Sequence, residues 1–105
     1  MIGFPHENLD CYRLAVGIAR WVAVQKFPPR RGDLADQAVR ASQSVVQNTA
    51  EGASRGGPAG RNFYRIALGS AGELCSILDL VDFAGGPEKQ AELRRVGAML
   101  RRLAG

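Results

Sequence analysis

The chain has 105 residues, which suits one domain of roughly 100–150 residues and leaves no room for a second. Hydrophobic residues make up 46% of the sequence, enough to fill a core, so an intrinsically disordered chain is excluded. The 14 lysines and arginines exceed the 10 acids and give a net charge of +4, a mild bias toward anionic partners. No apolar run approaches the roughly 20 residues that span a bilayer, and the first residues lack a basic-then-apolar leader. We therefore expect a cytoplasmic protein with no membrane partner.

Apolar residues recur at helical spacing in four segments, and no segment alternates in the way half-buried strands do, so the fold class is all-α. Asn8 and Asp33 are the expected N-caps of the first two helices. Proline and glycine residues separate the segments at 28–29, 56–58 and 85–86. The expected helices of this single domain, residues 1–105, span about 8–27, 33–54, 59–84 and 87–104.

Short connections between helices of this length place sequence neighbours antiparallel, which predicts an up-down-up-down four-helix bundle. Cys11 and Cys75 then lie on the parallel first and third helices, at heights that differ by on the order of 15 Å. A disulfide needs Cα atoms within about 7 Å. We expect two separate thiols.

The first helix carries more apolar residues than one face can hold. One stripe is Leu9, Tyr12, Val16, Ala19 and Ala23. A second stripe, Leu14, Ile18 and Trp21, is expected on the other side of the helix. The second stripe predicts an interface with another subunit, because a thin bundle offers it no cover. The alternative is that this helix is central within an unusual monomer.

Small residues gather on the second and third expected helices. They are Ala38, Ala41, Ala50, Gly52 and Ala53 on the second, and Ala67, Gly69, Ser70, Ala71 and Gly72 on the third. Such residues let two helices approach closely, so we expect a short distance between these two.

The residues offer little for catalysis. Cys11 and Cys75 have no CxxC or CxxH neighbour, so we expect no metal, and the glycine-rich stretch 52–60 lacks the lysine of a phosphate-binding loop. We expect no cofactor and no enzyme. The open alternative is a hydrolase in which His6 activates Cys11 as a nucleophile.

The last helix separates into an apolar face and an arginine face. The arginines are Arg94, Arg95, Arg101 and Arg102. Arginine binds phosphate through two parallel hydrogen bonds, so this face is the candidate nucleic-acid-binding surface. The alternative is an ordinary solvated face, because no aromatic residue on this helix could stack on a base. The turn residues Arg30, Arg31, Arg55 and Arg61 form a second, weaker candidate patch.

Four segments resemble one known family. They are residues 9–15 (LDCYRLA), 34–42 (LADQAVRAS), 48–55 (NTAEGASR) and 63–74 (FYRIALGSAGEL). Together they are similar to the four-helix-bundle proteins encoded in intervening sequences of bacterial large-subunit ribosomal RNA genes. That family also includes the accessory variability determinant of diversity-generating retroelements, a homopentamer that binds nucleic acid and associates with a reverse transcriptase. The resemblance implies a four-helix bundle and a homopentamer.

The resemblance also draws attention to a polar cluster of Asn48, Glu51, Arg55 and Glu73. We expect it to be structural, with Arg55 or Arg65 as the partner of Glu51. The resulting hypothesis is a non-enzymatic homo-oligomer that binds structured RNA or DNA through backbone contacts. The alternative is a protein-binding oligomer without a nucleic-acid role, for example a partner of a reverse transcriptase.

Overall fold

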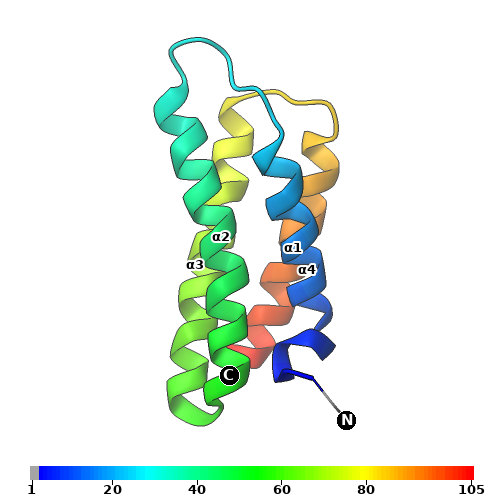
Figure 1. The fold of residues 1–105 in the computed structure, drawn as a ribbon, viewed down its shortest axis with the longest axis vertical. Helices are drawn as coiled ribbons and strands as arrows, with labels where there is room; N and C mark the ends of the chain where they lie inside the picture. Colours follow the sequence, from blue (N-terminus) through cyan, green and yellow to red (C-terminus); the bar gives the residue numbers. More distant parts are fainter. Residues whose placement is uncertain (1–2) are drawn as a thin grey trace.

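The computed structural model, which describes residues 3–105, is a bundle of four antiparallel α-helices preceded by one short turn of 3-10 helix (Figure 1). The elements are η1 (Pro5–Asn8), α1 (Asp10–Ala23), α2 (Gly32–Arg55), α3 (Gly57–Leu80) and α4 (Gly86–Ala104). The helices run alternately up and down along the long axis of a molecule measuring 44 × 24 × 20 Å. The predicted all-α, up-down-up-down four-helix bundle is confirmed.

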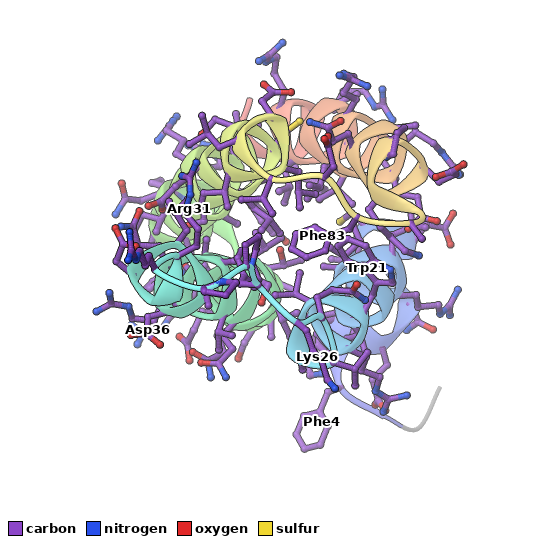
Figure 2. All side chains as sticks on the ribbon, turned by 90° about the horizontal axis from the view of Figure 1, so that it is seen from above. Phe4, Trp21, Lys26, Arg31, Asp36 and Phe83 are labelled. Atoms are coloured by element: carbon purple, nitrogen blue, oxygen red, sulfur yellow. The ribbon has the colours of Figure 1, made fainter. Side chains whose placement is uncertain are left out.

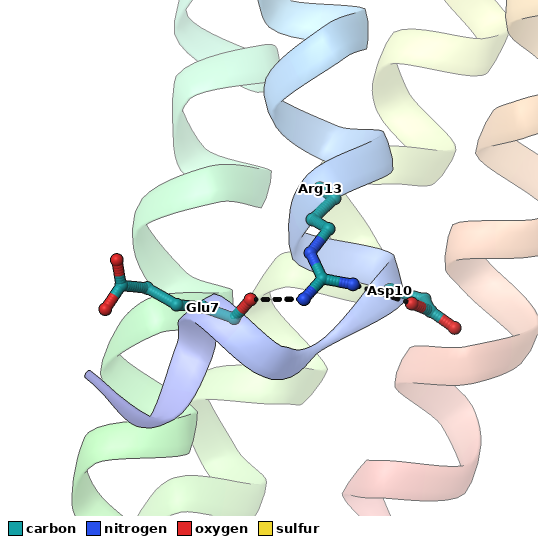
Figure 3. Close-up of polar contacts among 3 residues, drawn as sticks. All are labelled: Glu7, Asp10 and Arg13. Atoms are coloured by element: carbon teal, nitrogen blue, oxygen red, sulfur yellow. Dashed lines mark hydrogen bonds and ion pairs between the residues drawn. The ribbon is translucent and has the colours of Figure 1, made fainter. Parts of the chain in front are cut away.

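The first helix begins two residues later than predicted. Asn8 is not its N-cap, because η1 ends at Asn8 and the extended Leu9 is the cap residue of α1. Arg13 holds the two elements together: its Nη2 donates a hydrogen bond to the Glu7 carbonyl oxygen (2.9 Å) and its Nη1 pairs with Asp10 (3.2 Å) (Figure 3). Pro5 suits the first position of the short helix η1, so residues 5–8 form that element and α1 starts after it, at Asp10.

The second helix begins one residue earlier than predicted, at Gly32, and its N-cap is Arg31. Asp33 therefore lies in the first turn, where its negative charge interacts favourably with the positive end of the helix dipole. Among the charged residues that the structure describes, Asp36 and Arg40 do not form the ion pair that their spacing permits.

Helices α1 and α3 end early because an aromatic cluster forms between the loops that follow them. The Phe83 ring lies edge-on to Trp21, with centroids 5.8 Å apart, and edge-on to Phe27, with centroids 4.9 Å apart. Figure 2 shows Trp21 and Phe83 facing each other from α1 and the α3–α4 loop. Since both loops bend inward to form this cluster, the predicted ends at residues 27 and 84 are wrong, and the helices end at Ala23 and Leu80.

The second and third helices approach closely at the end where Gly56 joins them. A Cβ atom at Gly60 would lie 2.5 Å from the Gly52 carbonyl oxygen, and one at Gly52 would lie 2.6 Å from the Tyr64 ring. The prediction of close packing is confirmed here. It is wrong for Gly69 and Gly72, which are exposed and have no atom within 4 Å of an added Cβ.

The face of α1 that enters the core is centred on Cys11, Ala15, Ile18 and Val22. The two predicted apolar stripes therefore belong to one broad face: Ile18 lies in this central row, and the other residues of the two stripes flank the row on either side. Ile18 is only 1% exposed, and Leu14 and Trp21 are half-buried against the core. The expectation that this stripe needs another subunit to cover it is wrong for Ile18, which has no surface left to offer.

The core continues through the other helices as a single apolar cluster. Its largest fully buried members besides Ile18 are Leu74, Leu100, Val45, Val96 and Cys11, and the polar Thr49 is buried beside them. Cys11 and Cys75 are free, as predicted. None of the helices in the described part of the chain combines the length and apolar character that spanning a bilayer requires.

Candidate nucleic-acid interface

The α4 arginines are available to a ligand. Arg94, Arg95, Arg101 and Arg102 are all exposed. Within residues 3–105 the ion pairs are Arg13–Asp10, Arg55–Glu51 and Lys89–Glu92, so none of the four is neutralised by an acid. Their side chains also donate no hydrogen bond to another described residue, so all their N–H groups can reach a phosphate.

The four arginines form two pairs rather than one continuous stripe. Arg94 and Arg101, seven residues apart, border a groove between α3 and α4, whereas Arg102 borders a hollow between α1 and α4 beside Asp10. Arg95 is seven residues before Arg102 and therefore shares its side of the helix.

The groove between α3 and α4 has a volume of about 460 Å³. It is lined by Leu68, Ala71, Gly72, Cys75, Leu93, Arg94, Gly97, Ala98 and Arg101. Small residues make it deep: Gly97 faces Leu68, whose Cδ1 would lie 3.5 Å from an added Cβ. The groove therefore combines an apolar floor with two cations along its α4 side.

The second predicted patch does not exist as one surface. Arg30 and Arg31 lie in the loop between α1 and α2, at the end of the bundle opposite the α2–α3 turn, near which Arg55 ends α2 and Arg61 lies in the first turns of α3 (Figure 1). Arg55 is also engaged, because its Nε pairs with Glu51 (3.1 Å) and its guanidinium lies 5.3 Å from the Phe63 ring centroid.

Two cations of α3 lie at the C-terminal end of α4, a contact that the sequence analysis did not predict; Arg65 is not the partner of Glu51. Arg65 donates a hydrogen bond to the Ala104 carbonyl oxygen (3.2 Å), and the Arg61 side chain lies beside Gly105. These α3 residues interact with the negative end of the α4 dipole, close in sequence to Arg101 and Arg102. Antiparallel packing brings the start of α3 to the end of α4, so this basic end of the bundle could have been predicted from the helix order.

The predicted polar cluster of Asn48, Glu51, Arg55 and Glu73 is not one cluster. Glu51 takes Arg55 as its partner, and both side chains are about half exposed, at 49% and 59%. Glu73 is exposed and lines a shallow groove between α2 and α3. The two groups are separated along the bundle, so they cannot share a ligand.

Asn48 instead belongs to a small network between α2 and α3. Its Nδ2 donates to the backbone oxygen (2.9 Å) and the hydroxyl (3.0 Å) of Ser44, and the Ser44 and Ser70 hydroxyls are 2.7 Å apart. This contact fixes the relative height of the two helices. The serines were not predicted, because an exposed serine has no sequence signal that separates it from a partnered one.

His6 and Cys11 do not form a catalytic pair. The His6 ring packs on Tyr12, with centroids 4.5 Å apart, and stacks on Phe4. Cys11 is only 1% exposed, and burial raises the pKa of its thiol above the ordinary value of 9.0. A buried thiol that keeps its proton is a poor nucleophile, so this geometry does not support the hydrolase alternative.

The fold and the site together define a class of protein: a small four-helix bundle with exposed arginines along its last helix. Among residues 3–105 no group of His, Cys, Asp and Glu could hold a metal ion. The family model described as 23S rRNA-intervening sequence protein matches residues 7–100, and the chain belongs to this family. No curated protein matches the chain.

Proposed function

We propose that this chain is a non-enzymatic, homo-oligomeric scaffold, a homopentamer, that binds structured RNA or DNA through backbone contacts. The observation that carries the proposal is the set of exposed α4 arginines, Arg94, Arg95, Arg101 and Arg102, none of which has an acidic partner among the described residues. The name of the family, 23S rRNA-intervening sequence protein, agrees with an RNA-related role.

Assembly supplies the charge density that one chain lacks. A net charge of +4 is modest for one chain. Repeating the same arginine pairs around a ring adds their potentials and makes binding strong and salt-sensitive. Because the α4 face has no aromatic residue to stack on a base, we expect contacts to phosphates without sequence preference.

Support for a non-enzymatic role comes from the titratable groups. The buried Cys11 keeps its proton, and the paired carboxylate Glu51 is open to solvent beside Arg55. The Cys11 thiol is buried where no substrate reaches it, and Glu51 lacks the enclosed environment that tunes a carboxylate for acid–base chemistry.

The test is the salt dependence of binding to a labelled RNA hairpin, measured by fluorescence anisotropy. The test variant replaces Arg94, Arg95, Arg101 and Arg102 with Gln. The matched control replaces Lys26, Arg30, Arg31 and Arg40 with Gln, which removes the same charge from exposed residues elsewhere. We expect wild-type affinity to fall steeply as salt rises, with a logarithmic slope of about −0.7 to −0.9 per phosphate contact.

The α4 variant should lose most of its affinity and much of this slope, whereas the control should keep the greater part of both. Equal losses in the two variants would mean that net charge, not the α4 surface, drives binding. Absence of wild-type binding at low salt would remove the nucleic-acid role.

The alternative function is binding of a protein partner, for example a reverse transcriptase, without a nucleic-acid role. The apolar floor of the α3–α4 groove, formed in part by Leu68 and Leu93, favours it. Gly72→Leu fills this groove and leaves every arginine in place. Loss of partner capture with unchanged RNA binding in this variant would favour the alternative.

A further inference from the structure

An apolar groove lies between α1 and α2, on the edge of α1 away from Trp21. Its lining includes Val16, Ala19, Ala23, Val39 and Val46, and its volume is about 240 Å³. Arg20 also lines it, is exposed and has no acidic partner among the described residues. Val39 is 36% exposed, so the apolar lining continues onto the molecular surface. We call this the α1–α2 groove.

The outer side of α3 carries a ridge that is complementary to this groove, with an exposed apolar residue and a negative charge. Ile66 is 45% exposed, and Glu73, two turns further along, is exposed and has no basic partner within residues 3–105. Gly69 lies between them and has open space around it. These three residues, the α3 ridge, present one apolar side chain, one gap for close approach and one free carboxylate.

The groove and the ridge lie at the same height in the bundle. Ser44 of α2 meets Ser70 of α3 at 2.7 Å, and the two helices are antiparallel, so Val39 is level with residue 75 and Val46 with residue 68. Glu73 falls within this span, and Ile66 lies about 3 Å below it at ~1.5 Å per residue. Leu80, also apolar and 59% exposed, lies about 8 Å above it.

We propose that the α1–α2 groove of one copy receives the α3 ridge of a second copy. Ile66 packs at the lower end of the apolar groove beside Val46, Gly69 lets the helices approach, and Glu73 pairs with Arg20. The inference rests on the proposed self-association and names its two surfaces. The occupant is a second copy because the chain itself carries, at matching height, both the apolar side chain and the opposite charge that the groove requires.

A contact between two different surfaces is heterologous, so it produces rings or filaments rather than isolated twofold dimers. Both surfaces adjoin α2: the groove on its α1 side and the ridge beyond its α3 side. Successive copies placed at equal height therefore turn in one sense about an axis along the bundle, which is the arrangement that a ring requires. The α3–α4 groove with Arg94 and Arg101 stays outside this contact.

The experiment uses two variants that each spoil one surface: Val39→Asp in the groove and Ile66→Asp in the ridge. Both side chains are partly exposed, and far-UV circular dichroism checks that each variant keeps its helix content. Solution mass is measured by light scattering for each variant alone and for an equimolar mixture. Alone, each should show the 11.3 kDa mass of one chain, because no copy can be joined at its spoiled surface.

The mixture should double in mass, since the intact ridge of the groove variant fits the intact groove of the ridge variant and no further copy can add. Leu80→Asp, the control for an exposed apolar residue on the same helix, should keep the wild-type mass. A second pair of variants tests the charges: Arg20→Glu should weaken assembly, and combining it with Glu73→Arg should restore it.

Three results overturn the proposal in distinguishable ways. If Ile66→Asp keeps the wild-type mass while Val39→Asp is monomeric, the groove meets another groove. If both variants keep the wild-type mass, assembly uses a different surface, although the proposed self-association stands. If the wild type itself has the mass of one chain at every concentration, the proposed self-association fails first.

Discussion

The Trp21 ring meets the Phe83 ring edge-on, with 5.8 Å between centroids and 88° between planes. This contact joins the end of α1 to the loop between α3 and α4, and Gly85 lies close enough that an added Cβ would be 3.5 Å from the Trp21 Nε1. The pair closes the loop end of the bundle over its core.

Phe83→Ala should lower the free energy of unfolding by about 2–3 kcal/mol, at or below the low end of values for core phenylalanines because Phe83 is partly exposed. Removing the ring also uncovers Trp21, so tryptophan fluorescence should shift to longer wavelength. Urea unfolding and emission spectra measure the two effects. Phe4→Ala, at a ring that is 69% exposed, is the control and should change stability by less than about 0.5 kcal/mol. An unchanged spectrum for Phe83→Ala would contradict the described contact.

Two glycine substitutions of equal size should have opposite effects. Gly60→Ala places a Cβ 2.5 Å from the backbone oxygen of Gly52, so the helices must separate, with a loss of about 1–3 kcal/mol. Gly72→Ala adds a Cβ in open space and should raise stability by up to about 1 kcal/mol, the difference in helix propensity. Thermal unfolding of both variants and of wild type measures these changes in stability. Similar stabilities would mean that α2 and α3 do not approach closely at Gly52.

Stability should fall at alkaline pH because of the buried thiol. Burial raises the pKa of Cys11 above 9.0, so the folded chain keeps a proton that the unfolded chain releases. The stabilising effect of that proton is complete below pH 9.0 and is lost as pH rises toward the folded pKa. Burial also raises the pKa of Tyr64 above 10.0, which extends the decline in the same direction.

Cys11→Ala removes the thiol contribution, so its free energy of unfolding should decline less between pH 8 and about 10 than that of wild type. Cys75→Ala removes the partly exposed thiol and serves as the matched control, with a wild-type decline expected. Parallel curves for wild type and Cys11→Ala would contradict a protonated, buried Cys11.

The number and order of the helices could be predicted because proline and glycine residues mark the connections. The ends of α1 and α3 could not, because Phe83 leaves helical geometry to pack on Trp21 and Phe27, a contact between segments far apart in the sequence. Periodicity found both edges of the apolar face of α1 and Ile18 at its centre, but not Cys11 and Ala15, which look neutral as isolated residues. The α4 arginines are exposed as predicted, but which helix adjoins each pair depends on the packing of α4.

The solution mass of the wild-type protein, measured by light scattering over a range of concentrations at neutral pH, tests self-association most directly. A homopentamer predicts about five times the 11.3 kDa mass of one chain. A mass of 11.3 kDa at every concentration would contradict both the ring and the combined arginine surface that depends on it.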